Sequence, residues 1–166
     1  ATPDGEYTVR PRATGLALGG ASWPRLGSDG AWAPWLAAAG VEVAPLRPAN
    51  CGFDVQGGWS SYFAQRFAGQ PFKSVAIRFR DFERRGEFVA TATGIEGSVV
   101  YAAAASLRDA IDAEGGAVLE VDLLPDRTAA QVLAEVRHPR GARSLTSHLK
   151  SRLNLAGIKM AVLHER

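Results

Sequence analysis

The residues best suited to hold a ligand closely are a glycine pair near the N-terminus. An apolar run at residues 14–18 leads into Gly19-Gly20, where no side chain would keep a ligand from the backbone. Ligands of open α/β sheets bind beyond the carboxyl ends of strands, which is where this pair would lie. A turn without any ligand explains the same residues, and the glycines alone favour that alternative.

A second candidate is the segment 93–97 (TGIEG), which precedes a predicted helix. Its glycines, Gly94 and Gly97, can turn backbone N–H groups towards an anion. Glu96 is the carboxylate of this segment, and we expect it to act as an acid or base only if another domain shields it from water. The alternative is an ordinary turn between a strand and a helix.

Metal ligands and nucleophiles are sparse in the chain. His138, His148 and His164 lack the spacing of metal ligands, so we expect no metal site. Cys51 is the single cysteine, which excludes an internal disulfide and suits a reducing compartment such as the cytoplasm. We expect it to be a buried apolar residue. Because no nucleophile and base stand at a recognised spacing, a complete enzyme without a cofactor is disfavoured.

Charge is unevenly distributed over the C-terminal third. Residues 108–135 carry seven acids and two bases, whereas residues 136–166 carry seven bases and one acid, so the two segments could face each other. A basic helix facing solvent or another domain is favoured over phosphate contacts. We expect no membrane partner, because no apolar run approaches the roughly 20 residues that a span needs. The bases considered for phosphate contacts are Arg137, Arg140, Arg143, Lys150 and Arg152.

Short strands and one helix are predicted to position the first glycine pair. Residues 6–10 and 14–18 alternate or are apolar, as strands are, and residues 41–43 are a third candidate. Residues 32–39 carry apolar side chains at helical spacing, with Pro34 in the first turn, where its missing N–H costs little.

The middle of the chain predicts an aromatic-faced helix at residues 59–67 and two antiparallel strands. The strands are expected at residues 75–80 and 88–92, with the charged residues 81–86 as their hairpin connection. A helix follows, with apolar residues at helical spacing through residues 100–111 and Gly115-Gly116 as its expected end. Acidic residues near its C-terminal end oppose the helix dipole and predict that it is shorter than this.

The last third is predicted to be helical after a strand at residues 118–124. Asp126 is the expected N-cap of the first helix, and Ser144 that of the second. A third helix is expected to begin after Gly157.

Several segments in order resemble the NAD(P)/FAD-dependent flavoproteins of the YhiN type, a family related to aminoacetone oxidases and bile-acid-reducing flavoenzymes. The resemblance covers most of residues 13–163, and the order of its motifs carries it. The motifs are residues 17–30 (ALGGASWPRLGSDG), 45–53 (PLRPANCGF), 93–97 (TGIEG), 122–126 (DLLPD) and 143–149 (RSLTSHL).

This resemblance implies an α+β fold in three parts. Residues 1–50 would be a strand–loop–helix remnant of an FAD-binding domain, residues 51–125 the antiparallel barrel-like part of an insert, and residues 126–166 its helical part. The implied cofactor is FAD, with NAD(P)H as a further nucleotide. The resemblance implies that the flavin is lined by Gly19, Gly20, Ala21, Ser22 and Trp23 and covered from the insert by Gly94, Ile95, Glu96 and Gly97.

One sequence motif of the family is missing from these residues. The Gly-x-Gly-x-x-Gly fingerprint, which places a pyrophosphate on a helix N-terminus, does not occur. We therefore expect a piece of a longer flavoprotein, whose remaining domains are its partners, and we expect that this piece neither holds FAD nor catalyses alone. The alternative function is a non-catalytic module that uses its basic C-terminal helices to bind a protein or nucleic acid.

Overall fold

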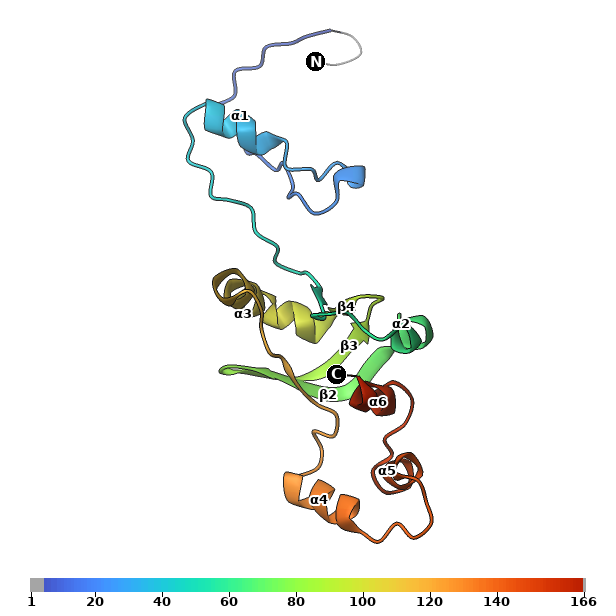
Figure 1. Cartoon of the computed structure of the whole chain (residues 1–166). Coiled ribbons are helices and arrows are strands. Elements are labelled where there is room, and N and C mark those ends of the chain that lie inside the picture. Colours follow the sequence, from blue (N-terminus) through green and yellow to red (C-terminus); the bar gives the residue numbers. More distant parts are fainter. Residues whose placement is uncertain (1–4, 166) are drawn as a thin grey trace. The chain divides into compact units, whose positions relative to one another are not determined.

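A computed structural model describes residues 5–165 of the chain (Figure 1). The chain divides into two units, residues 1–47 and residues 48–166. No helix within the described part of the chain is long and apolar enough to cross a membrane.

The first unit contains a short 3-10 helix, η1 (Pro24–Leu26), and one α-helix, α1 (Trp32–Ala38). The prediction of α1 is confirmed, with Pro34 in its first turn. The strands expected at residues 6–10, 14–18 and 41–43 are wrong, because these residues do not pair into a ladder within the described chain. An alternating sequence favours a strand only where a neighbouring strand can take up its hydrogen bonds.

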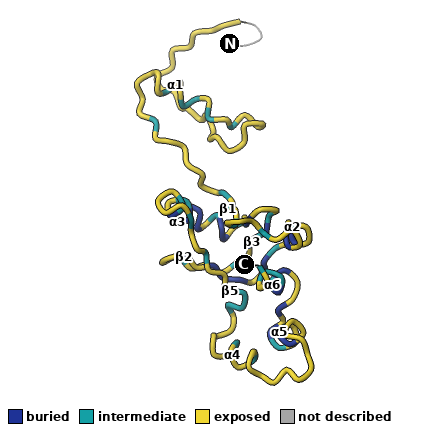
Figure 2. The backbone as a smooth tube through the Cα atoms, viewed as in Figure 1, coloured by how far each residue is buried: buried dark blue, intermediate teal, exposed yellow. Residues whose placement is uncertain are grey.

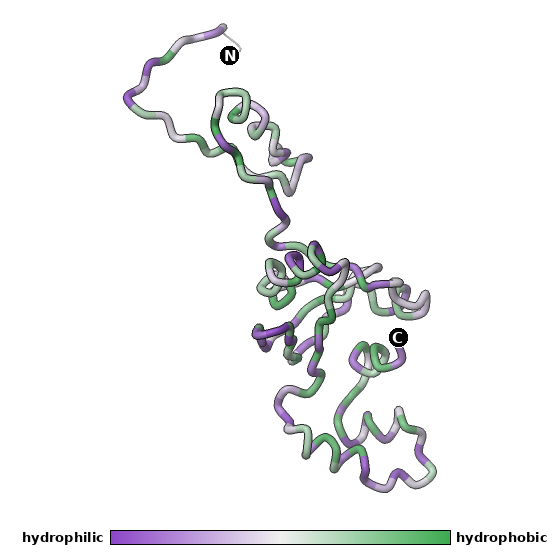
Figure 3. The backbone as a smooth tube through the Cα atoms, turned by 60° about the vertical axis from the view of Figure 1, so that its left-hand side comes forward, coloured by the Kyte–Doolittle hydropathy of each residue, from purple (hydrophilic) through white to green (hydrophobic). Residues whose placement is uncertain are grey.

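This first unit has no buried core. None of its described residues is buried, and Figure 2 shows its backbone exposed or intermediate throughout. Its sequence is nevertheless partly hydrophobic, as the green stretches in Figure 3 show. The exposed large apolar residues of the unit are Tyr7, Val9, Leu16, Leu18, Trp23, Leu26, Trp35, Val41 and Leu46.

A curled antiparallel sheet of five strands is the centre of the second unit and forms a half-barrel. The spatial order is β1-β4-β3-β2-β5, so the long strands β2 and β3 lie inside the sheet and both edge strands are short. The predicted α+β fold with a barrel-like sheet is therefore confirmed. The strands are β1 (Phe53–Asp54), β2 (Pro71–Phe79), β3 (Phe82–Ala90), β4 (Gly94–Glu96) and β5 (Glu120–Asp122).

The hairpin between β2 and β3 is longer than its sequence suggested. Phe79 pairs with Phe82, so the turn consists of Arg80 and Asp81 rather than of all the charged residues 81–86. Those charged residues form the first half of β3, where most of their side chains are exposed. The charged side chains there indicate that this part of the strand faces solvent. They do not indicate a loop.

Two helices accompany the sheet and share its core. Helix α2 (Ser61–Phe67) buries Phe63 and Phe67, and Trp59, which precedes its Ser60 cap, stacks on Phe63 with ring centroids 4.5 Å apart. Helix α3 (Ser98–Glu114) buries a stripe of small and apolar side chains against the strands. The buried residues of this unit are dark blue in Figure 2.

Helix α3 runs 17 residues to Glu114, so the predicted end at Gly115-Gly116 is confirmed and the expectation that acidic residues shorten the helix is wrong. Glu114, at the unfavourable end of the dipole, accepts a hydrogen bond of 2.5 Å from Arg80 at the hairpin tip. Gly115 then ends the helix in the left-handed conformation, φ 79°. The positive charge of Arg80, which belongs to another element, thus offsets the unfavourable interaction of Glu114 with the helix dipole.

The C-terminal helices form a second, smaller cluster around Leu153, Leu155 and Met160. Ser144 caps its helix as predicted. The predicted cap Asp126 is wrong: the cap is Thr128, whose side chain and that of Gln131 form a reciprocal capping box. The helices are α4 (Ala129–Arg137), α5 (Leu145–Leu153), α6 (Gly157–Ala161) and η2 (Val162–His164).

Candidate functional site

The first predicted site segment is a loop closed on itself within the N-terminal unit. The Gly19 carbonyl accepts a hydrogen bond from the Trp32 indole N–H at 3.0 Å, and the Gly20 carbonyl accepts one from the Gly30 N–H at 3.0 Å. Gly19 has φ 74°, a conformation that favours glycine. The backbone of residues 19–23 is therefore fixed by its own loop.

Residues 19–23, which include Ala21, Ser22 and Trp23, are all exposed. The backbone of an exposed loop can contact one face of a flat ring such as that of a flavin. It does not enclose that ring, so these residues alone do not fit an FAD, which sites of this kind surround with a strand, a helix N-terminus and further loops.

The second predicted segment lies in the sheet and has a structural reason for its first glycine. A Cβ at Gly94 would lie 1.9 Å from the Phe53 carbonyl oxygen of the adjacent strand β1, so no other residue fits. The Gly94 N–H donates to Thr91 Oγ1 at 2.8 Å, and its carbonyl accepts from the Trp59 indole N–H at 3.2 Å. Gly94 thus allows strands β1 and β4 to lie side by side.

The rest of this segment turns from strand β4 into helix α3. Ile95 pairs with Phe53 on one side and Ala90 on the other, so its backbone belongs to the sheet. Gly97 occupies the N-cap of α3 with φ 113°, and its Cβ would come within 3.2 Å of the Phe88 Cα. The carboxylate-bearing Glu96 is exposed. The predicted segments 19–23 and 94–97 belong to different units.

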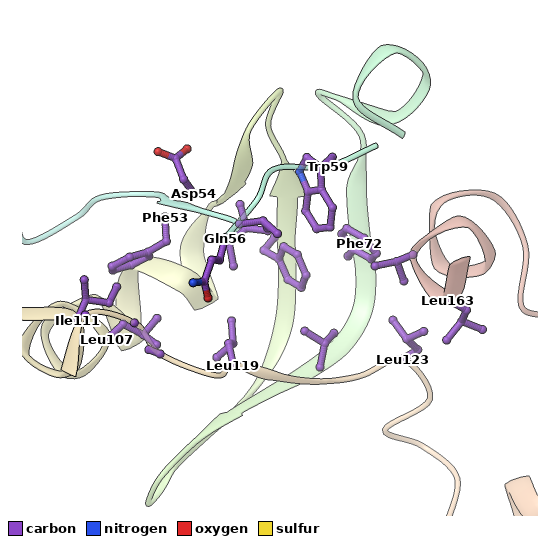
Figure 4. Close-up of a pocket in the computed structure, with 18 residues that line it drawn as sticks. Phe53, Asp54, Gln56, Trp59, Phe72, Leu107, Ile111, Leu119, Leu123 and Leu163 are labelled. Carbon is purple, nitrogen blue, oxygen red and sulfur yellow. The ribbon is translucent and has the colours of Figure 1, made fainter. Parts of the chain in front are cut away.

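The half-barrel encloses a cavity of about 680 Å³ that the sequence did not suggest. Figure 4 shows side chains converging on it from β1, the following turn, the sheet, α3, the segment after α3 and the C-terminal helix η2. Ile95 lines it and is the residue that it shares with the predicted site. Its walls are otherwise mostly aromatic and aliphatic, including Phe53, Trp59, Leu107 and Leu119.

Sequence reasoning missed this cavity because each of its residues reads as ordinary core. The lining extends from Phe53 to Leu163, and only the curled sheet brings its distant ends together. Phe53 and Trp59, for example, also pack against the hydrophobic core, so no local signal in the sequence sets them apart as cavity lining.

Residues 47–166 match the family model described as "HI0933-like protein barrel and H2TH domain". The chain belongs to the HI0933-like family. This confirms the resemblance to the YhiN-type flavoproteins, since the barrel and H2TH domain is the insert of that family. The half-barrel sheet and the helices that follow it fit the two parts of the description. No curated protein matches the chain significantly.

The helical part of this HI0933-like domain holds the buried histidine His148. Its Nε2 donates to the Glu135 carbonyl of α4 at 3.1 Å, since a carbonyl can only accept. His148 therefore joins α5 to α4. Within residues 5–165, no three His, Cys, Asp or Glu side chains gather as they would around a metal ion, and Cys51 is half-buried.

Basic side chains of the HI0933-like domain gather where α4 turns into α5. His138, Arg140, Arg143 and Arg152 line a depression of about 590 Å³. Arg152 also pairs with Glu135 at 2.5 Å, so here the acidic and basic segments face each other, as expected from their charges. Of the five bases named from the sequence, Arg137 and Lys150 do not line this depression.

Proposed function

We propose that the chain is the insert-bearing part of an FAD-dependent oxidoreductase, in which hydride passes to or from the flavin. FAD, when bound, would supply that hydride chemistry. The family match supports this function. The exposure of apolar side chains in the N-terminal unit supports the proposal that further domains are involved. That unit places large apolar side chains on its surface and buries none of its described residues.

A unit of this kind gains little from folding alone. Burial of apolar surface is the main favourable contribution to stability, and small domains have little of it to spare. Clustered exposed apolar residues in turn mark surfaces that other domains cover. We therefore propose that residues 1–47 pack against the remaining domains of a longer flavoprotein, and that those domains supply the dinucleotide-binding fold.

Roles for the candidate residues follow from this arrangement. Residues 19–23 would form one wall of the flavin site, since their backbone is exposed and fixed. Gly94, Ile95 and Gly97 would cover the site from the insert. Glu96 is exposed and would be the acid or base of this side once a neighbouring domain excludes water from it.

The nucleotide that delivers electrons is proposed to be NADH or NADPH, and the location the cytoplasm. The single cysteine, Cys51, fits a reducing compartment. A cytoplasmic location would then be consistent with the proposed family function and with the proposed flavin.

The test is anaerobic reduction of the longer protein that contains these 166 residues. Loss of the visible flavin absorption on adding NADH or NADPH, and its return on admitting air, is the expected result. A protein whose flavin is reduced by neither nucleotide would overturn the proposed oxidoreductase.

The depression between α4 and α5 supports a second candidate function, binding of a polyanionic partner. Arg140 and Arg143, which share one hollow with Arg152, can contact more than one phosphate or carboxylate at once, whereas Arg152 is paired with Glu135. Retention on heparin that falls steeply with salt, and that falls further in an Arg140→Glu, Arg143→Glu variant than in an Arg84→Glu control, would support it. Indifference to heparin and DNA at low salt would exclude it.

A further inference from the structure

We propose that the half-barrel cavity is a binding site for a neutral, largely hydrocarbon small molecule with a single polar group, which the side chain of Gln56 meets. This inference concerns binding by the second unit and does not depend on the flavin. It rests on the size of the cavity, the chemistry of its walls and the position of its few polar side chains.

The size and closure of the cavity suit a small molecule. Its volume of about 680 Å³ lies within the roughly 300–1,000 Å³ of ligand pockets. Phe72 and Phe88, stacked with centroids 4.6 Å apart and almost fully buried, form part of its lining. Val121 and Leu163, at 38% and 51% exposure, lie where it opens to solvent.

The walls determine the ligand's chemistry. Aromatic rings of Phe53 and Trp59 and the aliphatic chains of Leu107, Ile111 and Leu119 surround the space in Figure 4. Such a surface offers a ligand apolar contact and almost no hydrogen bonds, while water gains little there. A hydrocarbon body is therefore the favoured occupant.

Only one polar side chain of the lining is directed into the cavity. The Trp59 indole N–H already donates to the Gly94 carbonyl at 3.2 Å. The Asp54 carboxylate accepts from the Thr93 hydroxyl, and Figure 4 shows it turned outwards. In the same view the Gln56 amide points towards Leu119, with a donor and an acceptor to offer.

The charges of the lining disfavour an anion. Among residues 5–165, no Lys, Arg or His lines the cavity, and Asp54 is the only ionisable side chain in its lining. A carboxylate or sulfonate entering this space would lose its hydration and find no cation. The ligand should therefore be neutral, with a hydroxyl, carbonyl or amine group within reach of Gln56.

Two probes that share a ring skeleton test this selectivity. The neutral dye N-phenylnaphthylamine should bind the full chain saturably at one site with a rise in fluorescence. Its anionic counterpart, anilinonaphthalene sulfonate, should bind at least about tenfold more weakly, a difference of about 1.4 kcal/mol. Equal affinity for the two dyes, or no saturable binding of the neutral dye, as expected if a protein segment fills the groove, would overturn the proposal.

A pair of adjacent substitutions locates the dye. Leu119→Trp places a larger side chain in the cavity and should weaken binding of the neutral dye at least about tenfold. Val118→Trp adds the same ring to a neighbour that is 83% exposed and does not line the cavity, so it should leave binding unchanged. Equal effects of the two variants would contradict the assignment.

The Gln56→Leu variant keeps the test decisive if Leu119→Trp does not fold. Gln56 is exposed, so this substitution leaves the core intact. It should weaken the neutral dye severalfold by removing the partner of its amine, with an unchanged melting temperature. Unchanged dye affinity in this variant would contradict the role of Gln56.

Discussion

Gly94 lies where the backbones of β1 and β4 approach each other, and its missing side chain makes that approach possible. A Cβ there would overlap the Phe53 carbonyl and come within 2.6 Å of the Asp54 Cα, both of which are backbone atoms that cannot rotate away. The same glycine was singled out from the sequence for ligand binding. Its packing role is sufficient to explain its presence, whichever ligand the segment meets.

The Gly94→Ala substitution should lower the free energy of unfolding by at least about 3 kcal/mol, because the clash displaces an entire strand. Gly116→Ala is the matched control: its Cβ would meet nothing within 4 Å and its φ is not positive. We expect the control to change stability by no more than about 1 kcal/mol. Urea denaturation measures the stability of both variants, and equal midpoints would contradict this prediction.

Gly20 offers a cleaner test of the proposed flavin wall than Gly94. A Cβ at Gly20 would lie 3.7 Å from Ser28 Oγ, an ordinary contact, so the loop itself tolerates alanine. In the longer protein, Gly20→Ala should raise the dissociation constant of FAD at least about tenfold by separating backbone and ring. Gly15→Ala, with nothing within 4 Å, is the control. Equal FAD affinity of the two variants would remove Gly20 from the site.

Lys159 links α6 to strand β2 and to the segment that follows β5 through its ammonium group. It donates to the Ser74 carbonyl at 3.0 Å and the Leu123 carbonyl at 2.8 Å. Burial lowers the pKa of Lys159 below 10.5, while Asp126 and Asp122 act in the opposite direction. Since the unfolded chain then binds more protons than the folded one between the two pKa values, stability from this group rises with pH across that interval.

The Lys159→Met variant should lose about 1–3 kcal/mol, because two carbonyls lose their donor. The stability difference between the native chain and the variant should grow as pH is raised from neutrality to 10.5. Urea denaturation at a series of pH values measures both quantities. A difference that stays flat or shrinks would contradict the pKa shift.

At the scale of elements, α4 begins where its capping box lies. Thr128 accepts from the Gln131 N–H at 3.2 Å, and the Thr128 N–H donates to the Gln131 side chain at 2.8 Å. Asp126, two residues earlier, instead pairs with Arg85 at 2.8 Å on the surface. The carboxylate that resembled a cap therefore contributes to a contact between strand β3 and the turn before α4.

Thr128→Ala should cost about 1 kcal/mol, as loss of an N-cap does. Asp126→Ala should cost less than about 0.5 kcal/mol, because its ion pair is exposed at both partners. Thermal unfolding of the two variants compares them directly. The reverse order of melting temperatures would restore Asp126 as the cap.

Elements defined by local signals were predictable, and those defined by distant partners were not. The apolar stripe of α3 and the Ser144 cap are local, and both predictions are confirmed. Residues 6–10 and 14–18 are apolar or alternate like strands yet find no ladder, and the contact of Glu114 at the end of α3 with Arg80 comes from another element. The cavity needed the order β1-β4-β3-β2-β5, which no local pattern encodes.

At the scale of the whole molecule, the two units differ in what holds them together. Residues 48–166 have a core of buried aromatic and aliphatic side chains, and residues 5–47 have no buried residue. The motif order in the sequence identified the family correctly, whereas the exposed apolar surface of the first unit appears only in the structure. Together they lead to the proposal that this chain functions inside a larger flavoprotein.

Flavin content is the measurement that tests this account most directly. The longer protein and the 166-residue chain would each be purified, incubated with FAD, freed of unbound flavin and assayed for flavin per polypeptide. We predict one FAD per longer protein and none on the chain alone. A longer protein without flavin, or a chain that binds FAD tightly by itself, would contradict the account.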